Sequence, residues 1–201
     1  MIRALSVLLT AAVSAAAIAQ APANPPVRIR GTVERIDRTH LTVKANSGQS
    51  MNVELADNFV VMGIAKASLA EVASGKFIGT TTVGERDGAL VALEVHIFPE
   101  NMRGTGEGHY DWDLRPDSKM TNANVASVTS MGKDRVLTVQ YKGGEKKVLV
   151  SETTTIVSYT PVDRSELKPG AKVFLVSQRK PDGTLTAARV NVGLRGQVPP
   201  M

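Results

Sequence analysis

The sequence repeats one pattern of residues, and this internal repeat constrains the fold more than any other feature. The matching positions, 95 or 96 residues apart, are Gly48 and Gly144, Gly75 and Gly170, Asp87 and Asp182, and Val95 and Val190. Self-similarity at a fixed spacing indicates that one supersecondary unit occurs twice. We therefore expect two similar units, residues 27–98 and 126–193, joined by a connector of residues 99–125 and followed by a tail of residues 194–201. The connector is the main segment that the repeat does not explain, so function is expected there.

Both units have the alternating polar and apolar pattern of β-strands. The predicted strands are residues 30–36, 41–44, 51–55, 77–85 and 90–98 in the first unit, and 126–130, 136–140, 147–150, 172–178 and 185–192 in the second. Ser68 with Glu71 three positions later predicts a short helical turn, and residues 165–168 repeat it. Three strands, a helical turn and a hairpin are the order of an OB-like barrel. We predict an all-β protein of two tandem OB-like β-barrels, with SH3-like barrels or a single β-sandwich as alternatives.

Residues 1–19 have the pattern of a secretory signal peptide. Arg3 precedes a small, largely apolar stretch of residues 4–17, and Ala17-Ile18-Ala19 offers a cleavage site. The apolar stretch contains Ser and Thr and is shorter than the ~20 residues of a spanning helix. We expect a periplasmic protein, with secretion as the alternative and no transmembrane segment after signal cleavage. The chain has 0 cysteines, which excludes a disulfide framework and thiol chemistry.

The connector combines residue types that favour binding. Glycines alternate with Thr105 and Glu107, and the only tryptophan follows directly. Connecting segments often carry specificity, so we predict a loop that contacts a ligand or partner. Its residues are Arg103, Gly104, Gly106, Gly108, Tyr110 and Trp112. The alternative is a structural plug in which Tyr110 and Trp112 are buried between the barrels and Asp111 and Asp113 cap turns.

A divalent transition metal is the sharpest form of the binding hypothesis, although no cofactor is established by the sequence. Imidazole and carboxylate groups suited to Zn, Cu, Ni or Mn occur at His96, Glu100, Glu107, His109, Asp111 and Asp113. The second unit has Asn191 where the first has His96, and period two places His96 on the face opposite Val95. No spacing among these residues equals a recognised ligand motif, so ordinary surface residues are the alternative.

Other functions have weaker support in the sequence. Residues 104–108 resemble a phosphate loop only in glycine content, because no helical pattern follows and Glu107 would repel an anion. A hydrolytic enzyme remains an alternative, although we identify no catalytic residue and no nucleophile elbow. Nucleic acid is not expected as a partner of an exported chain with 4 Phe, 3 Tyr and 1 Trp.

Three motifs carry a resemblance to exported bacterial domains of the DUF5666 group. They are residues 31–43 with Gly-Thr-Val and Leu-Thr-Val, residues 167–170 with Leu-Lys-Pro-Gly, and residues 182–190 with Asp-Gly-Thr-Leu-Thr-Ala-Ala-Arg-Val. Some similar exported proteins are labelled metal-transporter permeases, yet a permease needs several spanning helices. The resemblance implies an exported β-barrel protein and supplies no catalytic residue. We expect a binding or accessory module for a small ligand, a metal or an envelope protein, with a structural or protein-interaction module as the alternative.

Overall fold

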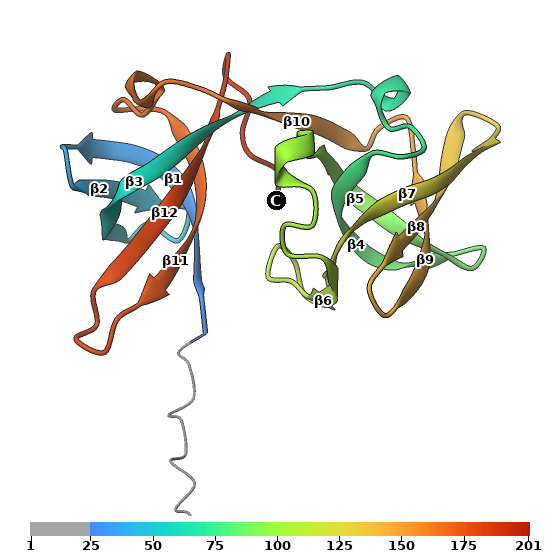
Figure 1. Ribbon diagram of the computed structural model, residues 1–201, viewed down its shortest axis with the longest axis horizontal. Helices are drawn as coiled ribbons and strands as arrows, with labels where there is room; N and C mark the ends of the chain where they lie inside the picture. Colours follow the sequence, from blue (N-terminus) through green and yellow to red (C-terminus); the bar gives the residue numbers. More distant parts are fainter. Residues whose placement is uncertain (1–24) are drawn as a thin grey trace, which may run out of the picture.

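The computed structural model describes residues 25–201, so the predicted signal peptide lies outside the described part (Figure 1). The described residues form strands joined by short turns, and no helix among them is long and apolar enough to cross a membrane. The strands are β1 Val27–Ile36, β2 His40–Ala45, β3 Ser50–Lys66, β4 Phe77–Arg86, β5 Ala89–Ile97, β6 Gly108–Asp111, β7 Lys119–Met131, β8 Asp134–Tyr141, β9 Gly144–Val150, β10 Thr155–Pro161, β11 Lys172–Arg179 and β12 Leu185–Gly193. Three 3-10 turns are η1 Leu69–Glu71, η2 Glu100–Met102 and η3 Arg164–Glu166.

The strands form two small barrels that lie side by side (Figure 1). Barrel 1 has the order β1-β2-β3-β12-β11, with β11 pairing back onto β1. Barrel 2 has the order β7-β8-β9-β5-β4, with β4 pairing back onto β7. Each barrel is a three-strand antiparallel meander closed by a hairpin, with one parallel pair, β3 with β12 or β9 with β5. The prediction of an all-β barrel fold is confirmed.

The two sequence repeats do not close separate barrels. The first repeat supplies β1, β2 and β3 to barrel 1 but β4 and β5 to barrel 2, and the second repeat does the reverse. The predicted division into one barrel of residues 27–98 and another of residues 126–193 therefore differs from the strand pairing. The repeats are real, but each gives its final hairpin to the other's meander.

The cause of this exchange is the length of β3. The predicted strand of residues 51–55 continues to Lys66, and the bulge at residues 56–59, around Asp57-Asn58, shifts its register with β12 without reversing the chain. At about 3.3 Å per residue, 17 residues extend well beyond one small barrel. In the second repeat β9 and β10 take the same path, and β10 pairs with the end of β3 and with β5. The crossing strands therefore join both barrels into one continuous sheet.

The structure also contains strands that the sequence pattern did not predict. The connector is partly extended, because β6 pairs with β7 and β7 begins at Lys119 rather than at residue 126. β10 is the second addition, since its residues follow a turn and have no counterpart among the predicted strands. These three segments lie between the barrels or lead into them, so they build the region where a site is expected.

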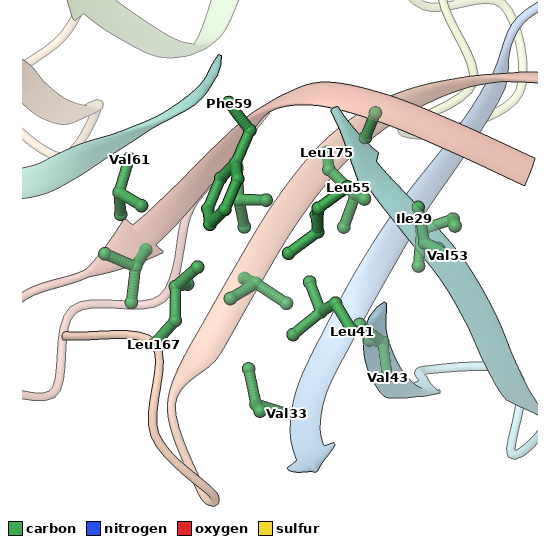
Figure 2. Packing of buried hydrophobic residues seen from close by; sticks show 14 of the residues in the cluster. Ile29, Val33, Leu41, Val43, Val53, Leu55, Phe59, Val61, Leu167 and Leu175 are labelled. Atoms are coloured by element: carbon green, nitrogen blue, oxygen red, sulfur yellow. The ribbon is translucent and has the colours of Figure 1, made fainter. Parts of the chain in front are cut away.

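Aliphatic side chains fill the barrels and aromatic side chains fill the space between them. The interior of barrel 1 is formed mainly by Val, Leu and Ile, as Figure 2 shows. The interior of barrel 2 has the same character. A third cluster, here called the aromatic cluster, lies between the barrels and includes Phe77, Phe98, Tyr159, Phe174, Met62, Ile64, Met102, Met120, Val157 and Met201, with Tyr110 and Trp112 packed against it. Six of the eight aromatic residues therefore belong to the contact between barrels.

Candidate functional site

A cavity of about 210 Å³ opens within the aromatic cluster, and we call it the interbarrel cavity. Its lining comes from both barrels, the crossing strand β10, the connector and residue 201. The lining residues are His96, Phe98, Thr105, Gly106, Tyr110, Trp112, Met120, Asn122, Tyr159, Phe174, Val176, Arg189, Asn191 and Met201. In Figure 1 the connector and the C-terminal end lie in the space between the barrels.

The barrel 2 wall is a row of residues on three neighbouring strands. Gly79 on β4 pairs with His96 on β5 and with Asn122 on β7. A Cβ at position 79 would lie 1.9 Å from His96 Nε2 and 2.4 Å from Asn122 Oδ1. Only glycine leaves room for the imidazole and the amide to approach each other over the strand.

A buried carboxylate holds the His96 ring in place. Glu94 Oε2 lies 3.0 Å from His96 Nδ1, and the two side chains are 1% and 3% exposed. Glu94 Oε1 accepts hydrogen bonds from the Thr81 backbone N–H at 2.9 Å and from the Thr81 hydroxyl at 2.7 Å. This contact favours the tautomer with a hydrogen on Nδ1, and Nε2 is directed toward Gly79.

The Asn122 side chain is oriented by the connector. Its Nδ2 donates to the Thr105 carbonyl oxygen at 3.1 Å and contacts the Tyr110 hydroxyl at 3.3 Å. These bonds settle which end of the amide is nitrogen, so Oδ1 faces Gly79. Asn122 is 6% exposed, and its Oδ1 has no hydrogen-bond partner within the described residues. A buried acceptor without a donor destabilises the fold, so a ligand with a hydrogen-bond donor would gain free energy by binding here.

The barrel 1 wall presents the equivalent positions with different residues. Phe174 on β11 pairs with Asn191 on β12, where the first repeat has Gly79 and His96. Asn191 is 6% exposed, and its Oδ1 is another buried acceptor without a partner in the described part of the chain. Arg189, two residues earlier, lines the same cavity and has a buried Nε that is also unpartnered there.

The connector forms the remaining wall through Tyr110 and Trp112. Arg28 lies over the Trp112 ring at 4.1 Å from its centroid, and Phe174 meets the ring edge-on at 6.2 Å. Asp113 holds the arginines, with Arg30 at 2.7 Å and Arg28 at 3.9 Å. Burial raises the pKa of Asp113, but the Arg30 hydrogen bond and both positive charges outweigh it and lower that pKa overall. Trp112 is therefore fixed between the barrels, while its Nε1 is buried without a partner among residues 25–201.

The six predicted metal ligands are distributed over different interactions. Tyr110 and Met120 pair across β6 and β7 on the cavity side, so the alternation of the strand turns His109 and Asp111 to the other side. Their partners are Glu94 for His96, Arg103 for Glu100, the Lys142 backbone N–H for Glu107, Thr121 for His109, Lys119 for Asp111 and Arg30 for Asp113. Within residues 25–201 no three His, Asp or Glu side chains are grouped as metal ligands. Metal binding stays a prediction from the sequence.

The predicted ligand loop divides into lining residues and anchors. Gly106, Tyr110 and Trp112 line the cavity, whereas Arg103 bonds Glu100 within the connector and, toward barrel 2, Asn124 and the Gly75 carbonyl oxygen. Gly104 and Gly108 have φ of +83° and +142°, and Gly106 has φ of +57°. These glycines shape the loop, and of the three only Gly106 lines the cavity.

Several residues of the cavity were not predicted. They are Phe98, Thr105, Met120, Asn122, Tyr159, Phe174, Val176, Arg189, Asn191 and Met201, together with the supporting Glu94. One sequence signal was present, because the repeat pairs His96 with Asn191 and Gly79 with Phe174 at the same separation of 95 residues. Polar residues at equivalent positions outside both barrel interiors indicate a shared contact surface.

Period two placed His96 on the face opposite Val95, and the structure agrees, since Val95 lies in the barrel 2 interior. The surface-histidine alternative for this residue is wrong, because the other barrel and the connector cover that face and leave His96 only 3% exposed. The structural-plug alternative for Tyr110 and Trp112 agrees with their position between the barrels, although both also line a cavity. No protein-family model, curated protein or solved structure matches the chain, and the resemblance to DUF5666 domains stays a prediction.

Proposed function

We propose that this protein is an exported binding module that takes up a small ligand in the interbarrel cavity. One observation carries the proposal. Six buried side-chain polar atoms lack a partner within the described residues, and four of them, on Trp112, Asn122, Arg189 and Asn191, belong to residues that line this one cavity. A buried donor or acceptor that lacks a hydrogen bond destabilises the fold by about 1–3 kcal/mol. The grouping of four such atoms around one cavity therefore favours a bound polar ligand that forms hydrogen bonds with them.

The size and lining of the cavity support a ligand of one ring. A cavity of roughly 150 Å³ accommodates benzene, so about 210 Å³ has room for a ring with one or two substituents. The aromatic walls are preformed, because Phe98 stacks on Tyr159 at 5.2 Å and His96 meets both rings edge-on. Apolar walls with a few convergent polar groups are typical of small-molecule sites.

The position of the connector is consistent with ligand binding and also with the alternative of a structural module. Trp112 contacts Arg28 and Phe174 of barrel 1, while β6 is hydrogen-bonded to barrel 2. The connector therefore links the barrels and lines the cavity at once. A hydrolytic enzyme has less support, because the ring that meets His96 from β10 is that of Tyr159, and burial raises the pKa of its phenol and keeps it protonated.

Trp112 supplies a direct test, since it is the only tryptophan and lines the cavity. We expect phenol, indole and benzoate, added singly to the mature protein, to raise the melting temperature, and phenol and benzoate also to change the Trp112 emission saturably. Val176→Phe, which places a ring at a lining residue that is itself 40% exposed, should abolish both effects.

The matched control is Val198→Phe, which changes a 54% exposed valine that is not among the residues lining the cavity. It should bind like the unchanged protein. The proposal fails if none of the three probes binds, or if Val176→Phe and Val198→Phe bind them equally well.

A further inference from the structure

The interbarrel cavity also carries information about the ligand's chemistry. We infer that the ligand is a small aromatic acid that bears a hydroxyl or amino group, with the acid toward Arg189 and the donor group between His96 and Asn122. This inference rests on the proposed function and deepens it. Three independent features support it: a pair of acceptors, a cation without an anion, and flat aromatic walls.

The acceptor pair is formed over Gly79. His96 Nε2 and Asn122 Oδ1 both lie within 2.4 Å of the point where a residue 79 Cβ would stand. In the tautomer with Nδ1–H bonded to Glu94, Nε2 is an acceptor, and Asn122 Oδ1 is an acceptor in any state of the ring. Two acceptors that face each other need a donor between them. A hydroxyl or amino group on the ligand supplies that donor, whereas an ether, a carbonyl or a bare ring does not.

The cation is Arg189. It lines the cavity from barrel 1, its Nε is buried and unpartnered, and it forms no ion pair among residues 25–201. Glu94 forms no ion pair with it among these residues, and its two oxygens bond Thr81 and His96 instead. Arg28 and Arg30, which flank the Trp112 wall, share the single carboxylate of Asp113. The charge around the cavity is therefore positive, and a planar guanidinium suits a carboxylate.

The aromatic walls of the cavity favour a flat ring between the acid group and the donor group of the ligand. Phe98 and Tyr159 stack with an angle of 1° between their rings, and Trp112 and Phe174, which also line the cavity, meet edge to face. Offset and edge-on contacts between aromatic rings are favourable by about 0.5–1.5 kcal/mol beyond the buried area. A flat ring therefore gains more from this cavity than a puckered ring of the same size.

Isothermal titration with four compounds tests each feature separately. The probe is 4-hydroxybenzoate, and it is compared with benzoate, which lacks the donor, with 4-hydroxybenzamide, which lacks the charge, and with 4-hydroxycyclohexanecarboxylate, which lacks the flat ring. We expect 4-hydroxybenzoate to bind about tenfold more tightly than each of the others, as for one lost charge-assisted or donor contact. Equal affinities of 4-hydroxybenzoate, benzoate and 4-hydroxybenzamide overturn the inference and leave the proposed function standing. No binding by any aromatic compound, phenol and indole included, overturns both.

Variants then assign the contacts. Arg189→Gln should remove the preference for 4-hydroxybenzoate over 4-hydroxybenzamide, and Arg35→Gln, an exposed arginine outside the cavity lining, should keep it. Gly79→Ala fills the space between His96 and Asn122 and should remove the preference over benzoate. If Gly79→Ala does not fold, the comparison of compounds on the unchanged protein still decides about the donor. An unchanged charge preference in Arg189→Gln refutes the role of that residue.

Discussion

The buried Glu94–His96 pair gives the sharpest prediction for stability. His96→Leu removes the Nδ1 donor and leaves a carboxylate that is 1% exposed without its partner at Oε2. Breaking a buried pair in this way costs about 3–5 kcal/mol. At roughly 2–4 °C per kcal/mol for a chain of this size, the melting temperature should fall by about 6–20 °C.

Glu94→Gln provides the matched background, because its amide oxygen can still accept from Thr81 and its nitrogen can donate to a neutral His96. In that background no buried charge is orphaned, so His96→Leu should cost about 2 kcal/mol less than in the unchanged protein. Urea unfolding of the four proteins in the double-mutant cycle measures this coupling. A coupling below about 0.5 kcal/mol would refute the reasoning, because additive effects indicate independent sites.

Three further predictions concern the exchange of strands, the interior and pH. Thr32→Cys with Lys172→Cys joins β1 to the exchanged strand β11, and this pair should form an intramolecular disulfide that is seen by gel mobility. Lys76 precedes β4, the strand of the first repeat that would take the place of β11 without the exchange, so Thr32→Cys with Lys76→Cys should stay reduced. Leu137→Ala, in the barrel 2 interior, should lower the free energy of unfolding by about 2–5 kcal/mol in urea. Burial, reinforced by two nearby lysines, lowers the pKa of His109, so its contribution to stability is present above the ordinary pKa of about 6.5 and is lost as pH falls through the folded pKa. Melting temperatures from pH 7.5 to 5 should therefore fall less in His109→Gln, and equal slopes would contradict this assignment.

Part of the site followed from local pattern. Alternation placed His96 outside the barrel interior, and the unusual composition of residues 99–125 marked the connector, from which Tyr110 and Trp112 reach the cavity. Alternation along β6 could also have separated His109 and Asp111 from Tyr110, but the connector was not recognised as a strand. The contacts of Asn122 and Arg189 could not be predicted, because they depend on which surfaces of the two barrels face each other.

The sequence by itself determined the class of the fold and its internal symmetry. Period-two patterns separated by Gly, Asp and Asn turns specify strands, and their recurrence after 95 residues specifies two similar barrels. Which repeat completes which barrel was decided only by the tertiary structure. The strand pairings within a barrel are the same whether its final hairpin comes from its own repeat or from the other repeat. The local sequence pattern therefore does not distinguish the two arrangements. The extension of β3 to Lys66 and its pairing with β10 make the difference, and the same crossing brings together the aromatic residues that line the cavity.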